Sequence, residues 1–212
     1  MKKNILFMGD SITWGYDPVT GGRFPEDIRF AGRQRSLLPD VNIIEEGLKG
    51  RTHAMGYGYD EVHNGHSMIT GLLKSHAPLD LFVIMLGTND CKPRYALTPY
   101  LIAGGLEANL NIVRSSYLWD WDKAPEILVV SPPLITMDFV GNVLEGEFDE
   151  TSLTRCAGLA AEYKRVADKL GCHFLNAADY AMVSKEDGIH MDEEGHRLLA
   201  DALAEKIREI LG

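Results

Sequence analysis

Short apolar runs alternate with longer mixed segments along the chain. The apolar runs predict five strands, at residues 5–8, 41–44, 81–86, 127–130 and 173–175. The segments between and after them predict helices at 26–38, 67–75, 99–118, 152–170 and 193–211. The run at 81–86 is apolar at every position, which is typical of a strand covered on both faces. Five strands, each followed by a helix, predict an α/β fold with a doubly wound parallel sheet.

Composition and charge narrow the class of protein. The 212 residues are 45% hydrophobic and 25% charged, which suits a globular protein with one compact domain spanning 1–212. The formal net charge is -10. Such a charge disfavours nucleic acid and anionic membranes, because both are bound through clustered Lys and Arg. We therefore expect neither as a partner.

The cysteines and the N-terminal sequence predict a cytoplasmic location. Cys91, Cys156 and Cys172 are odd in number and lack metal-ligand spacing, which predicts free thiols in a reducing environment. No apolar stretch approaches the ~18 residues that a membrane span needs. The few residues before the Gly-Asp-Ser sequence at 9–11 leave no room for the apolar region of a signal peptide. We expect a cytoplasmic protein.

A candidate nucleophile follows the first apolar run. The run ends in Gly9-Asp10-Ser11-Ile12. In an open α/β sheet, ligands bind just beyond the carboxyl ends of the strands, so Ser11 is placed where chemistry usually occurs. The same three residues are also favoured in ordinary turns, and the motif alone does not decide between the two interpretations.

Three further blocks supply what a nucleophilic serine needs: a base, a group that orients the base, and donors for an oxyanion. After the last strand, Asp187 and His190 have a D-x-x-H spacing that lets the carboxylate reach Nδ1 and leaves Nε2 for Ser11. Asn89 closes the third strand and offers a side-chain amide. Gly50 follows the second strand and, without a Cβ, can present its backbone N–H closely. Taken singly, each block is more typical of an ordinary loop or turn.

The four blocks together resemble the SGNH (GDSL) hydrolase superfamily, in which Ser, Gly, Asn and His stand in this order. The closer resemblance is to the bacterial oligomeric arylesterase/acyltransferase subgroup. It rests on GDSITWG at 9–15, IEEGL at 44–48, IMLGTND at 84–90 and VVSPP at 129–133. Gly50 stands where some members of the subgroup carry a slightly larger small residue, a change that leaves the backbone donor in place.

The resemblance implies a flavodoxin-like three-layer α/β/α sandwich with a five-stranded parallel sheet. It implies Ser11 as nucleophile, His190 as base, Asp187 as its partner, and an oxyanion hole from the Ser11 N–H, the Gly50 N–H and the Asn89 side chain. The implied activity is hydrolysis of short-chain aryl or carbohydrate esters through an acyl-enzyme, with acyl transfer to alcohols or peroxide as a side activity. The implied partners are a small-molecule ester and further copies of the chain, in an octamer. No cofactor and no metal is implied.

Substrate choice is expected to come from the surroundings of the serine. Trp14 and Tyr16 lie just past Ser11 and are bulky enough to close the acyl side, which predicts acyl chains of about two to four carbons. The irregular segments 16–25 and 132–150 are rich in Gly and Pro. Loops of this kind are often functional, so we expect them to set specificity.

Alternative interpretations stay open at this point. A lysophospholipase-like or thioesterase-like SGNH lipase would share the four blocks and prefer long acyl chains. A non-catalytic flavodoxin-like module would hold a phosphate or cofactor on the strand-end loops, but the first turn lacks both G-x-G-x-x-G and the P-loop pattern. His63 and His66 form a possible metal pair without a third ligand. The Trp-Asp-Trp-Asp stretch at 119–122 suits either an interface or the end of a helix.

Overall fold

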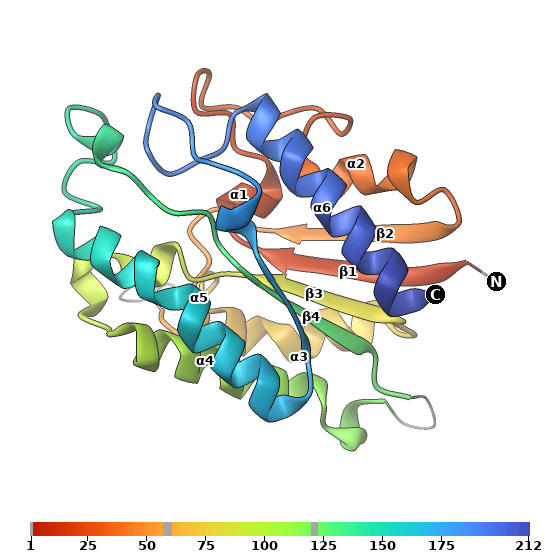
Figure 1. Ribbon diagram of the computed structural model, residues 1–212. Coiled ribbons are helices and arrows are strands. Elements are labelled where there is room, and N and C mark those ends of the chain that lie inside the picture. The colour runs from red at the N-terminus through yellow and green to blue at the C-terminus, as the bar shows by residue number, and fades with distance from the viewer. Residues whose placement is uncertain (1, 57–60, 120–122) are drawn as a thin grey trace.

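One parallel sheet organises the part of the chain that the structure describes, residues 2–56, 61–119 and 123–212 of a computed structural model. Its strands are hydrogen-bonded in the order β2-β1-β3-β4-β5 (Figure 1). They span Lys3–Gly9 (β1), Val41–Gly47 (β2), Leu81–Met85 (β3), Glu126–Ser131 (β4) and His173–Asn176 (β5). This order is the flavodoxin-like one, so the predicted five-stranded parallel sheet is confirmed.

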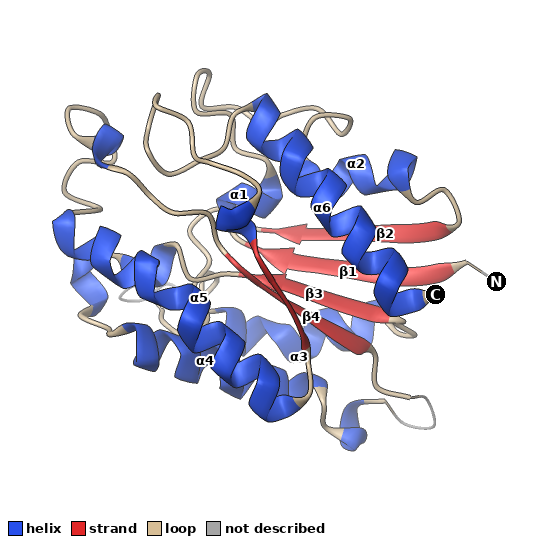
Figure 2. Cartoon of the chain, viewed as in Figure 1, coloured by secondary structure: helices blue, strands red, loops and turns tan. Residues whose placement is uncertain are grey.

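Helices cover both faces of the sheet (Figures 1 and 2). Helices α2 and α6 pack on one face, and α3, α4 and α5 pack on the other. The helices span Ser11–Trp14 (α1), Phe30–Leu37 (α2), Gly65–His76 (α3), Pro99–Val113 (α4), Glu150–Leu170 (α5) and Glu193–Leu211 (α6). The predicted three-layer α/β/α sandwich is therefore confirmed. Within the described residues, no helix combines the length and the apolarity that a membrane crossing requires.

Alternate residues of the central strands supply two cores. On β1, Ile5 and Phe7 pack in the core beneath α2 and α6, whereas Leu6 and Met8 pack in the core beneath α3, α4 and α5. Strand β3 is buried at every position, as its uninterrupted apolar run predicted. Each large apolar side chain removed from water contributes roughly 1.5–3 kcal/mol. A shift of register by one residue would exchange the two sets, so the cores fix where each strand ends.

Helices α3 and α5 each begin two residues before their predicted starts, and three other helices differ more from the sequence prediction. Helix α2 begins at Phe30 rather than at 26, because Arg29 adopts an extended backbone with ψ 136°. Helix α4 ends at Val113 rather than at 118, and the Trp119 indole N–H donates to the Val113 carbonyl oxygen over 2.7 Å. Helix α1 was not predicted, since its four residues are too few to show a helical period.

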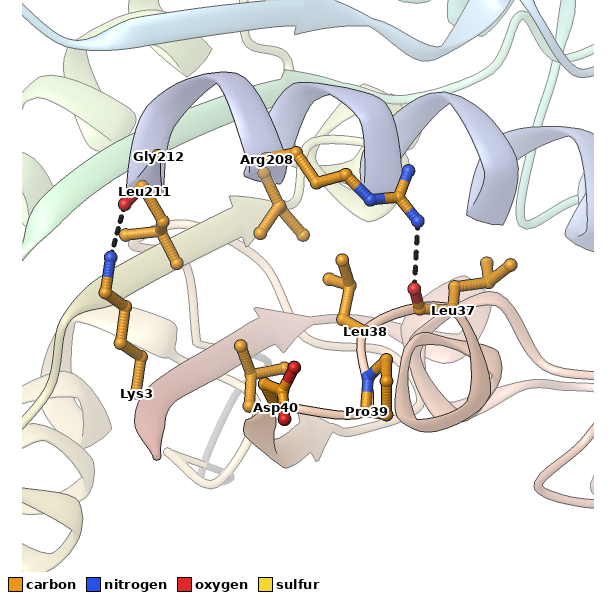
Figure 3. Close-up of a pocket in the computed structure, with 10 residues that line it drawn as sticks. Lys3, Leu37, Leu38, Pro39, Asp40, Arg208, Leu211 and Gly212 are labelled. Carbon is orange, nitrogen blue, oxygen red and sulfur yellow. Dashed lines mark hydrogen bonds between the residues drawn. The ribbon is translucent and has the colours of Figure 1, made fainter. Parts of the chain in front are cut away.

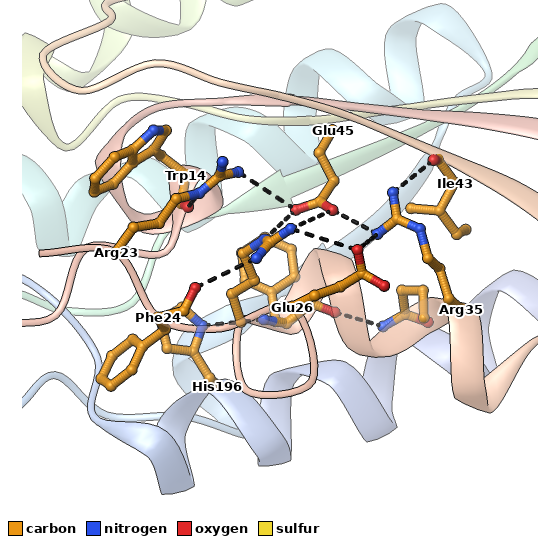
Figure 4. A network of polar contacts seen from close by, with 11 residues as sticks. Trp14, Arg23, Phe24, Glu26, Arg35, Ile43, Glu45 and His196 are labelled. Atoms are coloured by element: carbon orange, nitrogen blue, oxygen red, sulfur yellow. Dashed lines mark hydrogen bonds and ion pairs between the residues drawn. The ribbon is translucent and has the colours of Figure 1, made fainter.

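A buried carboxylate fastens the segment after α1 to strand β2 (Figure 4). Glu45 accepts from Arg29 Nε at 2.5 Å and from Arg29 Nη2 at 2.9 Å, and it also accepts from Arg35. Arg23 Nη2 lies 3.7 Å away. Burial by itself would raise the pKa of Glu45, but the hydrogen bonds from Arg29 and Arg35 outweigh it and hold the pKa below its ordinary value.

Replacement of this carboxylate should destabilise the fold in a pH-dependent way. Glu45→Gln leaves partly buried guanidinium groups with only the more exposed Glu26 as a counter-charge, so we expect a loss of about 3 kcal/mol at pH 7 in urea unfolding. Because the pKa of Glu45 is depressed in the folded state, its stabilisation is present above the ordinary glutamate pKa and is lost as the pH falls below it. The difference between wild type and variant should shrink toward low pH. Glu194→Gln, which breaks an exposed pair with Arg197, is the control and should change little.

Candidate active site

The sequence-predicted residues meet at the carboxyl ends of the strands. Ser11 follows β1, Gly50 follows β2, Asn89 follows β3 and His190 precedes α6. All four line one pocket with a volume of about 170 Å³. The pairing of Gly9 with Gly47 on one side and with Met85 on the other brings the three strand ends to the same level. The register of the sheet thus assembles the site.

A tight turn presents Ser11 at the first position of α1. The Asp10 carboxylate caps the turn by accepting from the Ile12 N–H at 2.9 Å. A Cβ on Gly9 would lie 1.9 Å from Thr13 Oγ1 and 2.8 Å from the Met85 carbonyl oxygen, so only glycine fits there. Burial raises the pKa of Asp10 to about 6, although the Ile12 N–H lowers it.

Ser11, His190 and Asp187 form a continuous hydrogen-bonded chain. Ser11 Oγ lies 2.8 Å from His190 Nε2, and His190 Nδ1 lies 2.5 Å from Asp187 Oδ2. Because a carboxylate only accepts, Nδ1 carries the proton and Nε2 accepts from the serine hydroxyl. Asp187 Oδ1 also accepts from the backbone N–H groups of Ile189 and His190, at 2.9 and 2.8 Å. Burial opposes ionisation of Asp187, but these hydrogen bonds and the imidazole hold its pKa below the ordinary value.

The candidate oxyanion donors lie on the wall beside Ser11. Gly50 has φ +79°, a conformation that L side chains rarely adopt, and a Cβ there would lie 3.0 Å from His63 Cδ2. Asn89 is 5% exposed, and its Nδ2 donates to the Arg51 carbonyl oxygen at 3.2 Å. This bond uses one of the two amide protons. The structure therefore brings together Ser11, Gly50 and Asn89 as the sequence predicted, around a space that a carbonyl oxygen can enter.

The two predicted aromatic residues take different places. Tyr16 lines the pocket, and its ring centroid lies 4.2 Å from that of His190 with the planes tilted by 37°. Among the described residues that line the pocket, Trp14 is not included. Instead, the Lys49 ammonium nitrogen lies 4.9 Å from the centroid of the Trp14 ring, and the central carbon of the Arg23 guanidinium lies 5.2 Å from it. Trp14 is thus placed beneath two cations at the side of the site.

Comparison with known proteins agrees with this geometry. The model of the GDSL-like lipase/acylhydrolase family matches residues 7–198. The chain belongs to this family. Its nucleophile–base–carboxylate geometry is that of an SGNH hydrolase, and it is a carboxylic ester hydrolase.

Solved structures of similar chains cover almost the whole length. A carbohydrate acetylesterase from Sinorhizobium meliloti is 35% identical with a TM-score of 0.92, over 99% of this chain and 100% of the other. The aryl esterase of M. smegmatis is 36% identical with a TM-score of 0.90 over the same shares. A lipase/acylhydrolase from Enterococcus faecalis, 18% identical with a TM-score of 0.69 over 98% of this chain and 96% of the other, shares the fold. No curated protein gave a significant match.

Five pocket residues of this SGNH hydrolase were not predicted. They are Lys49, Lys92, Leu144, Phe148 and Ile189. Leu144 and Phe148 come from the segment 132–150, which the sequence assigned to specificity without naming the residues that would act. Lys49 adjoins Gly50 and Ile189 adjoins His190, so adjacency to the motifs was the available signal. A long loop gives no such signal, because its path is set by tertiary contacts.

Ion pairs fasten the 132–150 segment at the pocket. Glu147 Oε2 lies 2.8 Å from Lys92 Nζ and 3.0 Å from an Arg94 guanidinium nitrogen. Lys92 Nζ also lies 5.2 Å above the Phe148 ring. Burial lowers the pKa of Lys92, whereas Glu147 raises it. The contacts hold Phe148, which is 3% exposed, against the pocket.

A buried network of hydrogen bonds begins at Asp90, the residue that follows Asn89. The Asp90 carboxylate accepts from the His53 N–H at 3.0 Å. His53 Nε2 lies 2.8 Å from the Tyr163 hydroxyl, which donates to the Leu86 carbonyl oxygen at 3.0 Å. Burial raises the pKa of Asp90 to about 7 and lowers the pKa of His53 to about 3. His53 is therefore neutral at physiological pH.

The remaining candidates from the sequence that the structure describes take part in hydrogen bonds or packing and do not form a metal site. His66 Nδ1 lies 2.9 Å from Asn109 Oδ1, and among the described residues no group of three or more His, Cys, Asp or Glu is arranged to hold a metal ion. Cys91, Cys156 and Cys172 are free thiols. Trp119 packs in the core and ends α4, whereas residues 120–122 of the same stretch lie outside the described residues.

A second cavity lies at the opposite end of the sheet, between β1, the start of β2 and the end of α6 (Figure 3). Its volume is about 300 Å³. Lys3 and Arg208 line it, and both donate to backbone carbonyl oxygens, of Leu211 and Leu37. The cavity lies at the end of the sheet opposite to the pocket that contains Ser11. Its two cationic side chains connect β1 to α6 and α6 to α2 through these hydrogen bonds.

Removal of the Asn89 amide should slow the chemical step. We expect Asn89→Ala to lower kcat by roughly 10²–10³, the usual loss for one oxyanion donor. KM should change little, because the donor acts on the transition state more than on the bound ester. The measurement is steady-state hydrolysis of phenyl acetate with thermal melting as the folding control. A rise in KM at constant kcat would make Asn89 a substrate-binding residue instead.

Proposed function

We propose that this SGNH hydrolase cleaves short-chain, acetyl-type esters of aryl or carbohydrate alcohols through an acyl-enzyme on Ser11. The observation that carries the proposal is the hydrogen-bonded chain from Ser11 Oγ through His190 to Asp187, which opens into a pocket of only about 170 Å³. The carbohydrate acetylesterase and the aryl esterase among the similar structures support the substrate class.

The proposed reaction uses the observed hydrogen bonds in order. Ser11 Oγ attacks the acyl carbon while His190 Nε2 takes its proton, and the oxyanion accepts from the donors at Ser11, Gly50 and Asn89. The bond to the alcohol oxygen breaks as His190 returns the proton to that oxygen. Water then adds to the acyl-enzyme with His190 as base, and Ser11 leaves with the proton as the carboxylic acid is released. Asp187 holds the imidazole in the required tautomer.

An apolar wall supports the preference for short acyl groups. Leu144, Phe148 and Ile189 line the pocket together with Tyr16, and the Lys92–Glu147 ion pair fastens the loop that carries Phe148. A long acyl chain would have to displace Phe148. The small pocket thus favours an acetylesterase over the lipase-like alternative, which needs room for many methylenes.

Acyl transfer is part of the proposal as a side reaction. The same acyl-enzyme reacts with whichever nucleophile reaches its carbonyl carbon, whether water, an alcohol or peroxide. The apolar lining from Leu144, Phe148 and Ile189 favours an alcohol over water at that position. The homo-oligomer, its octameric size and the cytoplasmic location stay predictions from the sequence.

The mechanism is tested by labelling and by mutation of its members. A fluorophosphonate should label wild type once, and mass spectrometry should place the adduct on the peptide that contains Ser11. Ser11→Ala and His190→Ala should each remove nearly all esterase activity, and the double variant should be little worse, because the members act as a unit. An adduct on another peptide would reject the assignment. The exposed Lys185→Ala is the control for folding and handling.

Shortening of the apolar wall should lengthen the accepted acyl chain. We expect Phe148→Leu and Phe148→Ala to raise the ratio of kcat/KM for p-nitrophenyl hexanoate to that for acetate by about fourfold for each methylene that gains room. The control is Val143→Ala, on the same loop but 88% exposed, which should leave the ratio unchanged. A preference of wild type itself for acyl chains of about eight carbons or more would reject the short-chain assignment.

A further inference from the structure

The catalytic pocket differs in charge from the rest of the molecule. The chain carries 31 acidic and 21 basic residues. Of the described residues that line the pocket, none is Asp or Glu, whereas Lys49, Lys92 and the catalytic His190 are present. A neutral ester requires no such reversal. The lining therefore points to a substrate with negative charge.

The two lysines differ in how far their charge is compensated. Lys92 is 8% exposed and pairs with Glu147 over 2.8 Å. Its charge is therefore compensated by the carboxylate of the 132–150 segment. Lys49 is exposed, and no carboxylate of the described residues lies within ion-pair distance of its ammonium group. Instead the ammonium lies 4.9 Å from the Trp14 ring centroid and 5.9 Å from that of Tyr16. Lys49 is thus the cation of the pocket that is available to a ligand.

The position of Lys49 assigns it to the alcohol portion of the ester. The pocket of about 170 Å³ has room for a short acyl group against Phe148, so the alcohol portion must extend toward solvent. Lys49 immediately precedes the oxyanion residue Gly50 and lies on the Trp14–Tyr16 side of the site. There the Tyr16 ring and the Lys49 ammonium border the pocket, on the side through which the alcohol portion would extend. Cations above aromatic rings remain able to bind carboxylates, because the ring occupies only one side.

A second cation lies on the same side. The Arg23 guanidinium is 5.2 Å from the Trp14 ring centroid (Figure 4) and shares the buried Glu45 with Arg29 and Arg35. Two carboxylates, Glu45 and the more exposed Glu26, face the three guanidinium groups, so the cluster keeps one positive charge in excess. The Trp14 side of the site therefore has a positive potential that extends beyond Lys49.

We propose that the natural substrate carries a carboxylate on the alcohol portion of the ester, an acidic aryl or sugar ring, and that Lys49 recognises this carboxylate at the pocket mouth. The inference rests on the proposed esterase function and names its substrate class. Lys49 acts on substrate choice, and the acyl transfer to Ser11 is unaffected by it.

The test compares two aryl acetates, one with an anionic and one with a neutral para substituent, by the release of their phenols; because their intrinsic reactivities differ, only the change in the ratio between wild type and variant is interpreted. They are 4-acetoxybenzoate and its neutral methyl ester, each assayed for kcat/KM with wild type, Lys49→Gln and Lys49→Arg at low ionic strength. We expect Lys49→Gln to lower the ratio of anionic to neutral kcat/KM by roughly two- to fivefold, the range of an exposed ion pair, and Lys49→Arg to restore it. Kinetics with the neutral ester serve as the reference, because a disturbance of Gly50 would lower kcat/KM for both esters alike and leave their ratio unchanged. Added salt should reduce the wild-type ratio more than that of Lys49→Gln, which keeps Arg23 but lacks the ammonium at the pocket.

A matched control separates a local contact from the field of the whole molecule. Lys74 also lies over an aromatic ring, 5.4 Å from the centroid of Tyr117, but far from the pocket. Lys74→Gln should leave the ratio unchanged. An unchanged ratio in Lys49→Gln, or an equal fall in Lys74→Gln, would overturn the proposal while the esterase function stands. If wild type hydrolysed neither ester, the proposed function itself would fail.

Discussion

The hydrogen bond between Ser11 and His190 joins residues 179 positions apart in the chain, and the chemistry depends on it. Its length of 2.8 Å requires that β1 end at the correct level and that the loop before α6 return to the same place. The alternating core residues of β1 set the first condition. The second is met by Asp187, which accepts from two backbone N–H groups of its own loop, and by Asp192, which caps α6 by accepting from the Gly195 N–H. Hydrophobic register and local capping together therefore convert distant residues into one catalytic group.

Two buried carboxylates beside the site illustrate a further constraint. Asp10 precedes Ser11, the proposed nucleophile, and Asp90 follows Asn89, the proposed oxyanion donor, and both are 1% exposed. A full negative charge on either would oppose an oxyanion nearby. Burial raises the pKa of Asp10 to about 6 and that of Asp90 to about 7, and for Asp90 the charge of Asp10 adds to the effect. Each carboxylate nevertheless has a structural task, because Asp10 accepts from the Ile12 N–H and Asp90 accepts from the His53 N–H.

The sequence predicted the parts of the molecule that short-range chemistry controls. Apolar runs located all five strands, and motifs at their ends located Ser11, Gly50, Asn89, Asp187 and His190. It could not predict the pocket wall, because Leu144 and Phe148 reach the site through a loop held by the Glu147 ion pairs with Lys92 and Arg94. Helix α1 could not be predicted for a different reason. Its four residues are specified by the Asp10 cap and by the left-handed Gly15 that ends it, which leave no periodic pattern.

The charge of the chain as a whole and the charge at its catalytic pocket act over different distances. In physiological salt the field of a surface charge decays over about 8 Å, so most of the 31 acidic residues have little effect at the pocket mouth. Groups that line the pocket act at shorter range and are screened less. Lys49 lines the pocket, and Arg23 lies over the same Trp14 ring, so both contribute positive potential near the pocket even in a protein of net charge -10. An acidic protein can in this way favour an anionic ester, since the choice is made by the few charges within contact of the substrate.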